Sequence, residues 1–348
     1  MFFKRSTTVK YSIAALVVAV LYCEWFIYLA QPFYWPSLEC EGVDASCTRV
    51  LFIADPQIQG DTAVAPPLSY LFNWDSDRYL KSTFSVVLNH FKPDVLVYMG
   101  DLMDEGSIAT MQQFHGYVKR LSKIFEINYS VVQIWLPGDN DIGGEGEPIK
   151  KDKVKEFAEV FEQPDVITFK NISFYKVNGI TYTVPHEMEL VDNNYKIVVS
   201  HYPVTHKHSF IHKMNAKIRP DIYFSAHDHD SKYVKQKRDL TQRQALYPLY
   251  SVLHIPRGDW LYEISVPTCS YRMGTSKIGY GAAVFENNNS LLHYTVFWSP
   301  QRFPYLLFYA FVLIPLCLYC LIFCQYRLLR CRETTSRKTD EVPLLKRV

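Results

Sequence analysis

The sequence predicts an α/β protein in which one large domain lies between two membrane-spanning helices. Runs of β-branched and aliphatic residues recur through the middle of the chain, and stretches with helical spacing lie between them. Such continuous apolar runs are typical of strands that are buried on both faces. A nearly uninterrupted apolar segment near each end has the ~20 residues that cross a bilayer. The central ~250 residues are long enough for one large domain with a full core.

Five apolar runs are predicted to be strands, and each is followed by a polar residue of the same general kind. They are residues 50–54, 95–100, 131–138, 197–200 and 222–226, followed by Asp55, Asp101, Asp139, His201 and His227. Ligands of α/β proteins gather outside the carboxyl ends of the strands. We therefore expect these five side chains at one rim of the domain.

The segments between these strands give further predictions. Helical spacing predicts helices over residues 75–91 and 151–162. Residues 172–177 and 180–184, joined by Asn178-Gly179, predict a hairpin with a type I′ turn.

The chain has 37 Lys and Arg against 35 Asp and Glu, a formal net charge of +2. This balance gives no case for a nucleic-acid partner.

The polar residues at the strand ends are metal-ligand types. Taken singly, an Asp after a strand is more often a helix cap or turn residue, and a lone His is a satisfied polar group. Five in one structural context, with His229 two residues after His227, favour a two-metal hydrolase. Two cations ~3.5 to 4 Å apart can bind both an attacking hydroxide and phosphoryl oxygens. Mixed imidazole and carboxylate ligands suit Mn, Fe or Zn better than Mg or Ca.

These residues stand in short motifs that resemble the ordered blocks of the calcineurin-like metallophosphoesterases. The motifs are Asp55-x-Gln57, Gly100-Asp101-x-x-Asp104, Gly138-Asp-Asn-Asp141, His201 and His227-x-His229. The resemblance covers residues 48–297. Residues 100–106, 138–143 and 265–272 are similar to the membrane-anchored branch that remodels GPI anchors and to its fungal cell-division-cycle relatives. The resemblance implies a four-layer sandwich of two mixed β-sheets flanked by helices.

The resemblance also implies a site. The implied ligands are Asp55, Gln57 and His229 for the first metal, Asp101 as the bridge, and Asp139, His201 and His227 for the second. The cofactors would be two divalent ions, Mn first, with Fe or Zn as alternatives. A bridging hydroxide would be the nucleophile. Arg272 either meets the substrate phosphate bidentately or forms a structural ion pair.

The chain departs from the family pattern at three of these positions. Gln57 replaces an imidazole with a weaker amide ligand, and Asp139 replaces an Asn. Asn140 stands where the family has its catalytic His, and its amide binds a phosphoryl oxygen but gives up no proton at neutral pH. A lost general acid is worth ~10² to 10⁴ in rate. The alternatives to a phosphodiesterase are a silent metal-binding protein that binds GPI glycan or cargo, and a manganese homeostasis factor.

The two apolar segments predict the membrane topology. Lys4, Arg5 and Lys10 precede the first, and a cluster of Arg and Lys follows the second, so both termini are expected in the cytosol. A cleaved signal peptide is the other interpretation of the first segment, but no small-residue cleavage site precedes Gln31. Glu24 sits near a membrane interface, pairs with a polar group of the second helix, or is a tolerated charge near the helix end. Tyr28, Tyr34 and Trp35 resemble an interfacial belt.

The predicted organisation therefore alternates between cytosol, membrane and lumen. It comprises a cytosolic N-terminus (1–10), a transmembrane helix (11–30), a lumenal linker (31–48), a lumenal catalytic domain (49–297), a second transmembrane helix (305–324) and a cytosolic tail (325–348). Sequons at Asn128, Asn171 and Asn288 agree with a lumenal domain. Cys40 and Cys47 lie at a spacing that allows a small disulfide loop, which leaves Cys269 unpaired.

The expected partners follow from this topology. They are a GPI glycan or another phosphodiester in the lumen, membrane lipid, and a cargo receptor or sorting adaptor at the cytosolic tail. Leu344-Leu345 has the form of an acidic dileucine signal, although two chance leucines in a tail are equally consistent. The resemblance implies residence in the endoplasmic reticulum, its exit sites or the Golgi.

Overall fold

The computed structural model describes the backbone of residues 5–39, 47–185, 193–247, 251–286 and 291–340. It describes the side chains of the same residues, except for 5–9 and 327–340. The chain divides into two compact units. One comprises Met1–Ile27 with Arg302–Val348, and the other is the globular unit Tyr28–Gln301. Each unit is described by itself.

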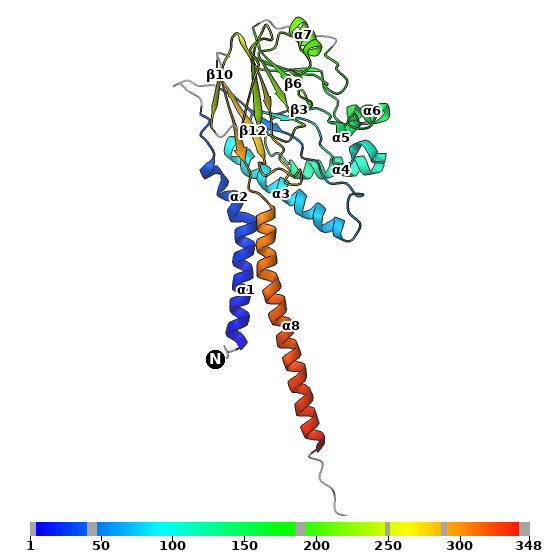
Figure 1. The fold of residues 1–348 in the computed structure, drawn as a ribbon, viewed down its shortest axis with the longest axis vertical. Helices are drawn as coiled ribbons and strands as arrows, with labels where there is room; N and C mark the ends of the chain where they lie inside the picture. Colours follow the sequence, from blue (N-terminus) through cyan, green and yellow to red (C-terminus); the bar gives the residue numbers. More distant parts are fainter. Residues whose placement is uncertain (1–4, 40–46, 186–192, 248–250, 287–290, 341–348) are drawn as a thin grey trace, which may run out of the picture. The chain divides into compact units, whose positions relative to one another are not determined.

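The globular unit contains two mixed β-sheets (Figure 1). The first has the strand order β10 (Leu253–Pro256), β13 (Leu291–Trp298), β12 (Gly279–Phe285), β1 (Thr48–Ile53), β2 (Val95–Tyr98) and β3 (Val132–Trp135). The second has the order β4 (Val166–Phe169), β5 (Ile172–Lys176), β6 (Tyr195–Val199), β7 (Ile222–Ser225), β11 (Trp260–Ser265), β8 (Lys232–Lys237) and β9 (Gln244–Leu246). All five strands predicted from the apolar runs are present.

Those five strands belong to the parallel parts of the two sheets, which in the second sheet also include β5 and β11. β1, β2 and β3 run parallel in the first sheet, and β6 and β7 run parallel in the second. The inner faces of both sheets share one apolar core, in which the rings of Phe52 and Phe224 stack with centroids 4.0 Å apart. Because the sheets pack face to face, the carboxyl ends of these strands reach a common rim.

Helices cover the outer faces of the two sheets. The described helices of the globular unit are α3 (Leu68–Phe91), α4 (Met111–Ile124), α5 (Asp139–Ile142), α6 (Lys151–Val160) and α7 (His208–Lys217), with the short 3₁₀ turns η2 (Gln31–Tyr34) and η3 (Gly106–Ile108). On α3, Thr83 hydrogen-bonds Tyr280 of the first sheet at 2.9 Å. Apolar residues of α7 form a second core cluster with the outer face of the second sheet. The predicted α/β class with two mixed sheets and helices is confirmed.

Two local predictions were wrong in detail. Residues 180–184 form no strand: β5 pairs with β4 as an antiparallel hairpin and with β6 in parallel, and only an isolated bridge joins Asn178 and Thr183. The Asn178 side chain instead accepts the backbone N–H groups of Ile180 and Thr181, which turns the chain away from the sheet. Helix α3 begins at Leu68, two turns before the predicted start at residue 75.

The other unit contains two helices that are long and apolar enough to cross a membrane, over Lys10–Leu29 and Phe303–Tyr326. Its elements are α1 (Arg5–Leu21), the π-helical turn η1 (Tyr22–Phe26), the start of α2 (Ile27–Leu29) and α8 (Phe303–Asp340). Glu24 accepts hydrogen bonds from Arg302 at 3.0 Å and from Tyr309 at 2.6 Å. The structure thus shows the expected pairing of Glu24 with a polar group of the second helix, since Tyr309 belongs to α8.

The cysteines and the interfacial aromatics give a mixed outcome. Cys47 is disulfide-bonded, whereas its expected partner Cys40 lies outside the described residues. Cys269, which the expected pairing of Cys40 with Cys47 leaves over, is free and buried. Trp35 belongs to the globular unit, because its ring packs on Phe297 with centroids 4.8 Å apart and its indole donates to a strand β13 carbonyl.

Candidate metal centre

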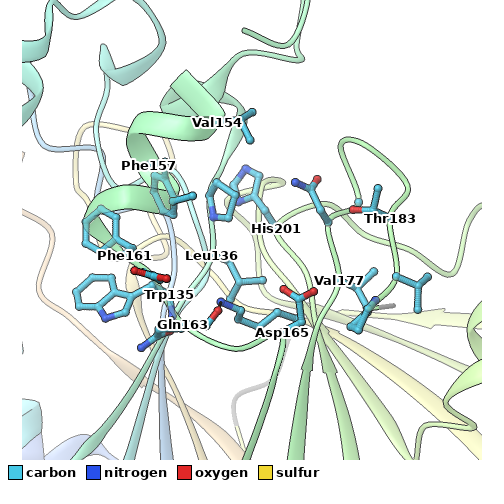
Figure 2. A pocket seen from close by; sticks show the side chains of 18 residues that line it. Trp135, Leu136, Val154, Phe157, Phe161, Gln163, Asp165, Val177, Thr183 and His201 are labelled. Atoms are coloured by element: carbon cyan, nitrogen blue, oxygen red, sulfur yellow. Dashed lines mark hydrogen bonds between the residues drawn. The ribbon is translucent and has the colours of Figure 1, made fainter. Parts of the chain in front are cut away.

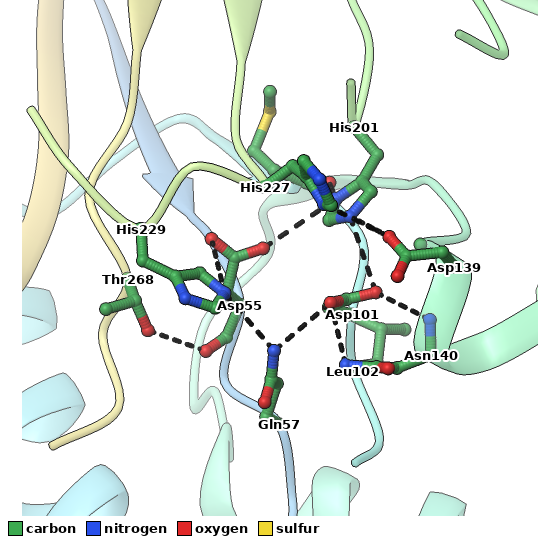
Figure 3. Close-up of polar contacts among 12 residues, drawn as sticks. Asp55, Gln57, Asp101, Leu102, Asp139, Asn140, His201, His227, His229 and Thr268 are labelled. Atoms are coloured by element: carbon green, nitrogen blue, oxygen red, sulfur yellow. Dashed lines mark hydrogen bonds and ion pairs between the residues drawn. The ribbon is translucent and has the colours of Figure 1, made fainter. Parts of the chain in front are cut away.

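The residues predicted as metal ligands meet at the shared rim of the two sheets (Figure 3). Asp55 and Asp101 follow β1 and β2, and Asp139 begins α5 just after β3. His201 and His227 follow β6 and β7 of the other sheet. Gln57 and His229 lie two residues further along two of these loops, after Asp55 and His227. All seven predicted ligands are therefore brought together, although the set is divided between two sheets.

The ligand atoms form two close groups that share one imidazole. Asp139, His201 and His227 have ligand atoms within 4.8 Å of one another, and so have Asp55, Asp101 and His201. His201 Nε2 lies 3.0 Å from Asp139 Oδ1 and 3.4 Å from Asp101 Oδ1. The first group is the set that the family resemblance implied for the second metal. The second group contains the implied bridging residue Asp101.

Gln57 and His229 stand at the edge of the second group. Their Nε2 atoms are 3.2 Å apart, and His229 Nε2 is 4.0 Å from Asp55 Oδ2. The Gln57 amide donates to Asp101 Oδ2 at 3.1 Å, and a flip of that amide would present its oxygen instead. The pair thus borders the Asp55 carboxylate without joining the close group.

Asp55 carries the clearest sign that a cation fits here. Its side chain is fully buried, and neither carboxylate oxygen has a hydrogen-bond partner among the described residues. Its nearest ion-pair partner is the His201 ring, whose Nδ1 lies 3.7 Å from Asp55 Oδ1. A buried carboxylate that accepts no hydrogen bond is costly unless it is well paired or coordinates a metal. The oxygens of Asp55 therefore match the needs of a divalent ion between Asp55 and Asp101.

The electrostatics of the centre show a shortage of positive charge. Burial raises the pKa of Asp55 well above its usual range, and the neighbouring Asp101 raises it further. Burial also raises the pKa of Asp101. For His201, burial would lower the pKa, but Asp101, Asp139 and Asp55 together raise it to about 10. Three carboxylates that hold a proton on a buried imidazole are a donor set suited to divalent cations.

The backbone at the centre is unusual. Five of the seven predicted ligand residues adopt a positive φ, namely Asp55 (47°), Gln57 (41°), Asp101 (49°), His227 (67°) and His229 (56°). This region is uncommon for residues other than glycine, costs about 1 to 3 kcal/mol per residue, and clusters at functional sites. No sequence pattern predicted it.

Two further side chains hold these loops in place. Asp141 accepts the backbone N–H groups of Leu102, Met103 and Gly138 at 2.9 to 3.1 Å, which ties the Asp101 loop to the Asp139 turn. Thr268 Oγ1 donates to the Asp55 carbonyl at 2.8 Å. Neither was predicted as a site residue, although both lie in runs that carried the family resemblance.

Comparison with known proteins agrees with this geometry. Residues 48–231 match the family model of the calcineurin-like phosphoesterases. The chain belongs to this family. It is similar to Metallophosphoesterase 1 of Ailuropoda melanoleuca, with 29% identity over 182 residues, 51% of this chain and 45% of that protein. It is likewise similar to Metallophosphoesterase 1 of Danio rerio, with 28% identity over 172 residues, 48% of this chain and 44% of that protein.

The chain spans about half the length of the curated relatives it matches. Among solved structures, a protein described as GAP50, the anchor in the inner membrane complex of Plasmodium, matches at 12% identity and a TM-score of 0.37. That match covers 71% of this chain and 83% of the other. Members of the phosphoesterase family use divalent metals, which agrees with the two ligand groups.

The other residues predicted to be catalytic, Asn140 and Arg272, take different positions relative to the ligand groups. Asn140 lies at the centre: its backbone N–H donates to Asp101 Oδ1 at 3.0 Å and its amide donates to Asp101 Oδ2 at 2.9 Å. Arg272 donates to the Gln57 carbonyl at 2.9 Å and to Asp104 Oδ2 at 2.7 Å. The Arg272 guanidinium thus forms a structural ion pair, which was one of the two roles predicted for it. Its hydrogen bond to the Gln57 carbonyl also positions the Gln57 loop.

Two cavities flank the metal-ligand groups and share Gly179 in their walls. One has about 420 Å³, borders His201 and is lined largely by apolar side chains of β3, α6 and the end of β5, among them Trp135, Phe157 and Phe161 (Figure 2). The other has about 460 Å³, borders His227 and is lined by aromatic side chains and by charged side chains of both signs. The two cavities therefore leave room beside the ligand groups for a molecule larger than inorganic phosphate.

Gly138 allows the close approach of the two acidic loops. A Cβ at this position would lie 2.0 Å from Asp101 Oδ1 and 2.2 Å from the Asp101 backbone nitrogen. We predict that Gly138→Ala displaces Asp101 and lowers the content of both metals, measured by elemental analysis of purified protein. Gly116→Ala on α4 is the matched control, because its Cβ meets no atom within 4 Å. Normal metal content in Gly138→Ala would contradict the placement of Asp101.

Proposed function

We propose that the chain is a membrane-anchored, metal-dependent phosphodiesterase of the secretory lumen. The observation that carries this proposal is the convergence of acidic and imidazole ligands into two groups, with His201 shared and Asp101 beside it. In such a site two bound divalent ions would supply a nucleophilic hydroxide and Lewis-acid stabilisation of the phosphoryl oxygens. Manganese is the proposed metal, with iron or zinc as alternatives, because the ligands mix nitrogen and oxygen.

The chain's own residues would bind and orient the phosphodiester. Asp55, Asp101 and Asp139 would hold the cations, together with His201, His227, His229 and Gln57. Asn140 would hydrogen-bond a phosphoryl oxygen, but it provides no proton for the leaving group. Tyr202, whose ring contacts that of His227 with centroids 4.1 Å apart, has its pKa raised by burial and by Asp139, so it keeps a proton near the site.

The substrate that we propose is an ethanolamine-phosphate branch on a GPI-anchor glycan, removed to aid GPI-protein maturation and transport. The support comes from the cavity beside His227. Its walls contain Arg243, which suits a phosphate, Lys232, which is ion-paired with Asp228, and the rings of Tyr182 and Tyr202, which suit a large polar substrate with apolar faces. The named relatives are metallophosphoesterases, which supports the reaction class alone.

The decisive experiment combines metal content with turnover. Full-length protein in detergent should bind two metal ions, hydrolyse a nitrophenyl phosphodiester, and release ethanolamine phosphate from a purified GPI glycan. Asp55→Ala and His227→Ala should lose the activity. Hydrolysis of the nitrophenyl ester without release of ethanolamine phosphate from the glycan would support the phosphodiesterase activity but reject this substrate. Two bound metals without turnover of either would reject the enzyme.

A second function has one specific observation in its favour. Asn140 is turned toward Asp101 at the position where the family resemblance places a proton donor, and an amide is no acid. A catalytically silent protein that uses the metal centre to bind GPI glycan or cargo would tolerate this. Such a protein would bind the glycan in a metal-dependent manner without changing it.

We further propose that the globular unit is lumenal, with both termini in the cytosol and residence in the endoplasmic reticulum, its exit sites or the Golgi. The sequon residues Asn128 and Asn171 are exposed, as glycan acceptors must be, while Asn288 lies outside the described residues. The proposed adaptor signal at Leu344-Leu345 also lies outside them.

This topology predicts a glycosylated chain. Glycosidase treatment should increase gel mobility, and joint replacement of Asn128, Asn171 and Asn288 by Gln should abolish that shift. The globular unit should resist protease in intact microsomes and become sensitive after detergent. A chain without glycans whose globular unit is digested in intact microsomes would reverse the orientation.

A further inference from the structure

The first two turns of α3 carry an exposed apolar surface that the metal centre does not use. Its residues, the α3 tip, are Leu68 (56% exposed), Tyr70 (71%), Leu71 (56%), Phe72 (44%) and Trp74 (58%). A helix that is apolar on nearly all sides is normally buried against something. Clustered exposed apolar residues mark an interaction site. In Figure 1 the light blue end of α3 extends away from the two sheets.

One face of α3 connects this tip to both ends of the globular unit. Leu68, Phe72 and Tyr79 share that face, because helix residues at such spacings align. The Tyr79 hydroxyl donates to the Pro300 carbonyl at 2.8 Å, and its ring meets the ring of Tyr28 with centroids 6.1 Å apart. The unit begins at Tyr28 and ends at Gln301. The middle of α3 therefore lies where the chain enters and leaves the unit.

Both of these points adjoin a candidate membrane span. Tyr28 lies within the last two residues of Lys10–Leu29, and Pro300 precedes Phe303–Tyr326 by three residues. A headgroup layer is roughly 5 to 8 Å thick on each side of the hydrocarbon core. If the two candidate spans cross a membrane, the short covalent connections at both points would keep Tyr79 near the headgroups. From Tyr79 the tip extends along the helix axis by about 7 to 17 Å at 1.5 Å per residue.

We propose that the α3 tip inserts into the lipid headgroup interface of the membrane that anchors the chain. Its composition fits this partner, since Trp and Tyr prefer the membrane interface and Leu and Phe provide buried apolar area. Arg78 lies over the Trp74 ring at 5.2 Å, which places a cation beside the aromatic group at headgroup depth. Phe33 and Tyr34 of η2, 90% and 80% exposed, add aromatic surface just after the first span. The inference rests on the membrane anchoring proposed above.

Insertion would orient the metal centre over the lipid. The Tyr79 ring packs on Tyr271 with centroids 5.0 Å apart, and the Tyr271 hydroxyl donates to Asp75 of α3 at 2.8 Å. The next residue, Arg272, holds the carbonyl of Gln57. A rigid path thus runs from the α3 tip to the ligand loops. An enzyme oriented in this way would act on phosphoesters attached to lipid at a fixed height above the bilayer.

The test uses the full chain with one engineered cysteine at a time. Cys317, Cys320, Cys324 and Cys331 are first replaced by Ala, since Cys23 and Cys269 are buried. Tyr70→Cys, Leu71→Cys and Trp74→Cys are labelled with an environment-sensitive fluorophore, and Val154→Cys on α6, 37% exposed, is the matched control. The protein is reconstituted into phosphatidylcholine vesicles that contain nitroxide-labelled lipid, and iodide serves as the aqueous quencher.

Labels at the α3 tip should be quenched by the nitroxide lipid at least about twofold more than the control label, and less by iodide. Adding Leu71→Glu and Trp74→Glu should remove the lipid quenching at Tyr70→Cys. Vesicle-integrated protein whose tip labels behave like the Val154 label would overturn the proposal. Tip labels protected from both quenchers would show that protein covers the tip, which overturns it equally. Extraction of the chain by alkaline carbonate would instead reject the membrane anchoring itself.

Discussion

Asp101→Asn should lower the occupancy of both metal sites and reduce phosphodiester hydrolysis by at least about 10²-fold. The reason is position: Asp101 belongs to one ligand group and lies 3.4 Å from the shared His201 of the other. Substitution keeps the side chain's shape but removes the charge that can bridge two cations. Metal content by elemental analysis and hydrolysis of a nitrophenyl phosphodiester provide the measurements.

His229→Ala is the matched control for this prediction. His229 is absent from both close groups and touches only the edge formed by Gln57 and Asp55. Its loss should therefore affect one metal and leave the other bound.

Thermal stability separates a lost metal from a damaged fold. Asp101→Asn removes one of three carboxylates that lie together, so the metal-free variant should be at least as stable as the metal-free wild type. Added Mn²⁺ at about 100 times its Kd should stabilise the wild type by about 2.7 kcal/mol and the variant by much less. Two metals and full activity in Asp101→Asn would show that the bridging role is wrong.

The sequence predicted the five parallel strands because each is a continuous apolar run, as buried strands must be. The edge strands were harder to predict. β9 is exposed along its whole length, and β4 is at best partly buried, so neither has a strong hydrophobic pattern. The Asn178-Gly179 pair predicted a hairpin through its local turn preference. Tertiary pairing of β5 with β4 and β6 overrode that preference.

The composition of the site was predictable from the sequence, whereas its geometry was not. The order of polar residues after strands indicated which side chains would meet. Three features of the geometry depend on how the loops pack around the site. They are the division of the ligands between two sheets, the sharing of His201 by both ligand groups, and the positive φ angles of Asp55 and Asp101. Contacts such as Thr268 with the Asp55 carbonyl join residues far apart in the chain, so local patterns could not reveal them.

The α3 tip shows the same limit from another side. Its residues do not alternate between apolar and polar with a helical period, so the predicted helix began at residue 75, where such a period starts. The structure extends the helix to Leu68 with five exposed apolar residues. Here the amphipathic rule failed because five apolar side chains of the segment stay exposed within the described part of the globular unit. A segment whose exposed apolar residues break the usual pattern of a surface helix is expected at a functional surface.

Asn140→His should raise the rate on alkyl phosphodiesters, which have poor leaving groups, by up to about 10²-fold and change the rate on nitrophenyl esters little. Asn140 is partly buried and its amide lies 2.9 Å from Asp101 Oδ2, so an imidazole there would reach the site. A histidine can deliver a proton to a departing alkoxide, whereas nitrophenolate leaves without one. Initial rates on the two ester classes provide the measurement.

The result depends on whether another residue already supplies the proton, and Tyr202 is the structural candidate because it contacts His227 and lines the adjoining cavity. If Tyr202 acts as the donor, Tyr202→Phe should slow alkyl esters selectively, and Asn140→His should restore their hydrolysis in that background. If neither residue matters for either ester while two metals remain bound, proton donation does not limit the rate. Two bound metals with no turnover in wild type and in Asn140→His would leave the binding function, because the replaced acid would then have been restored without restoring chemistry.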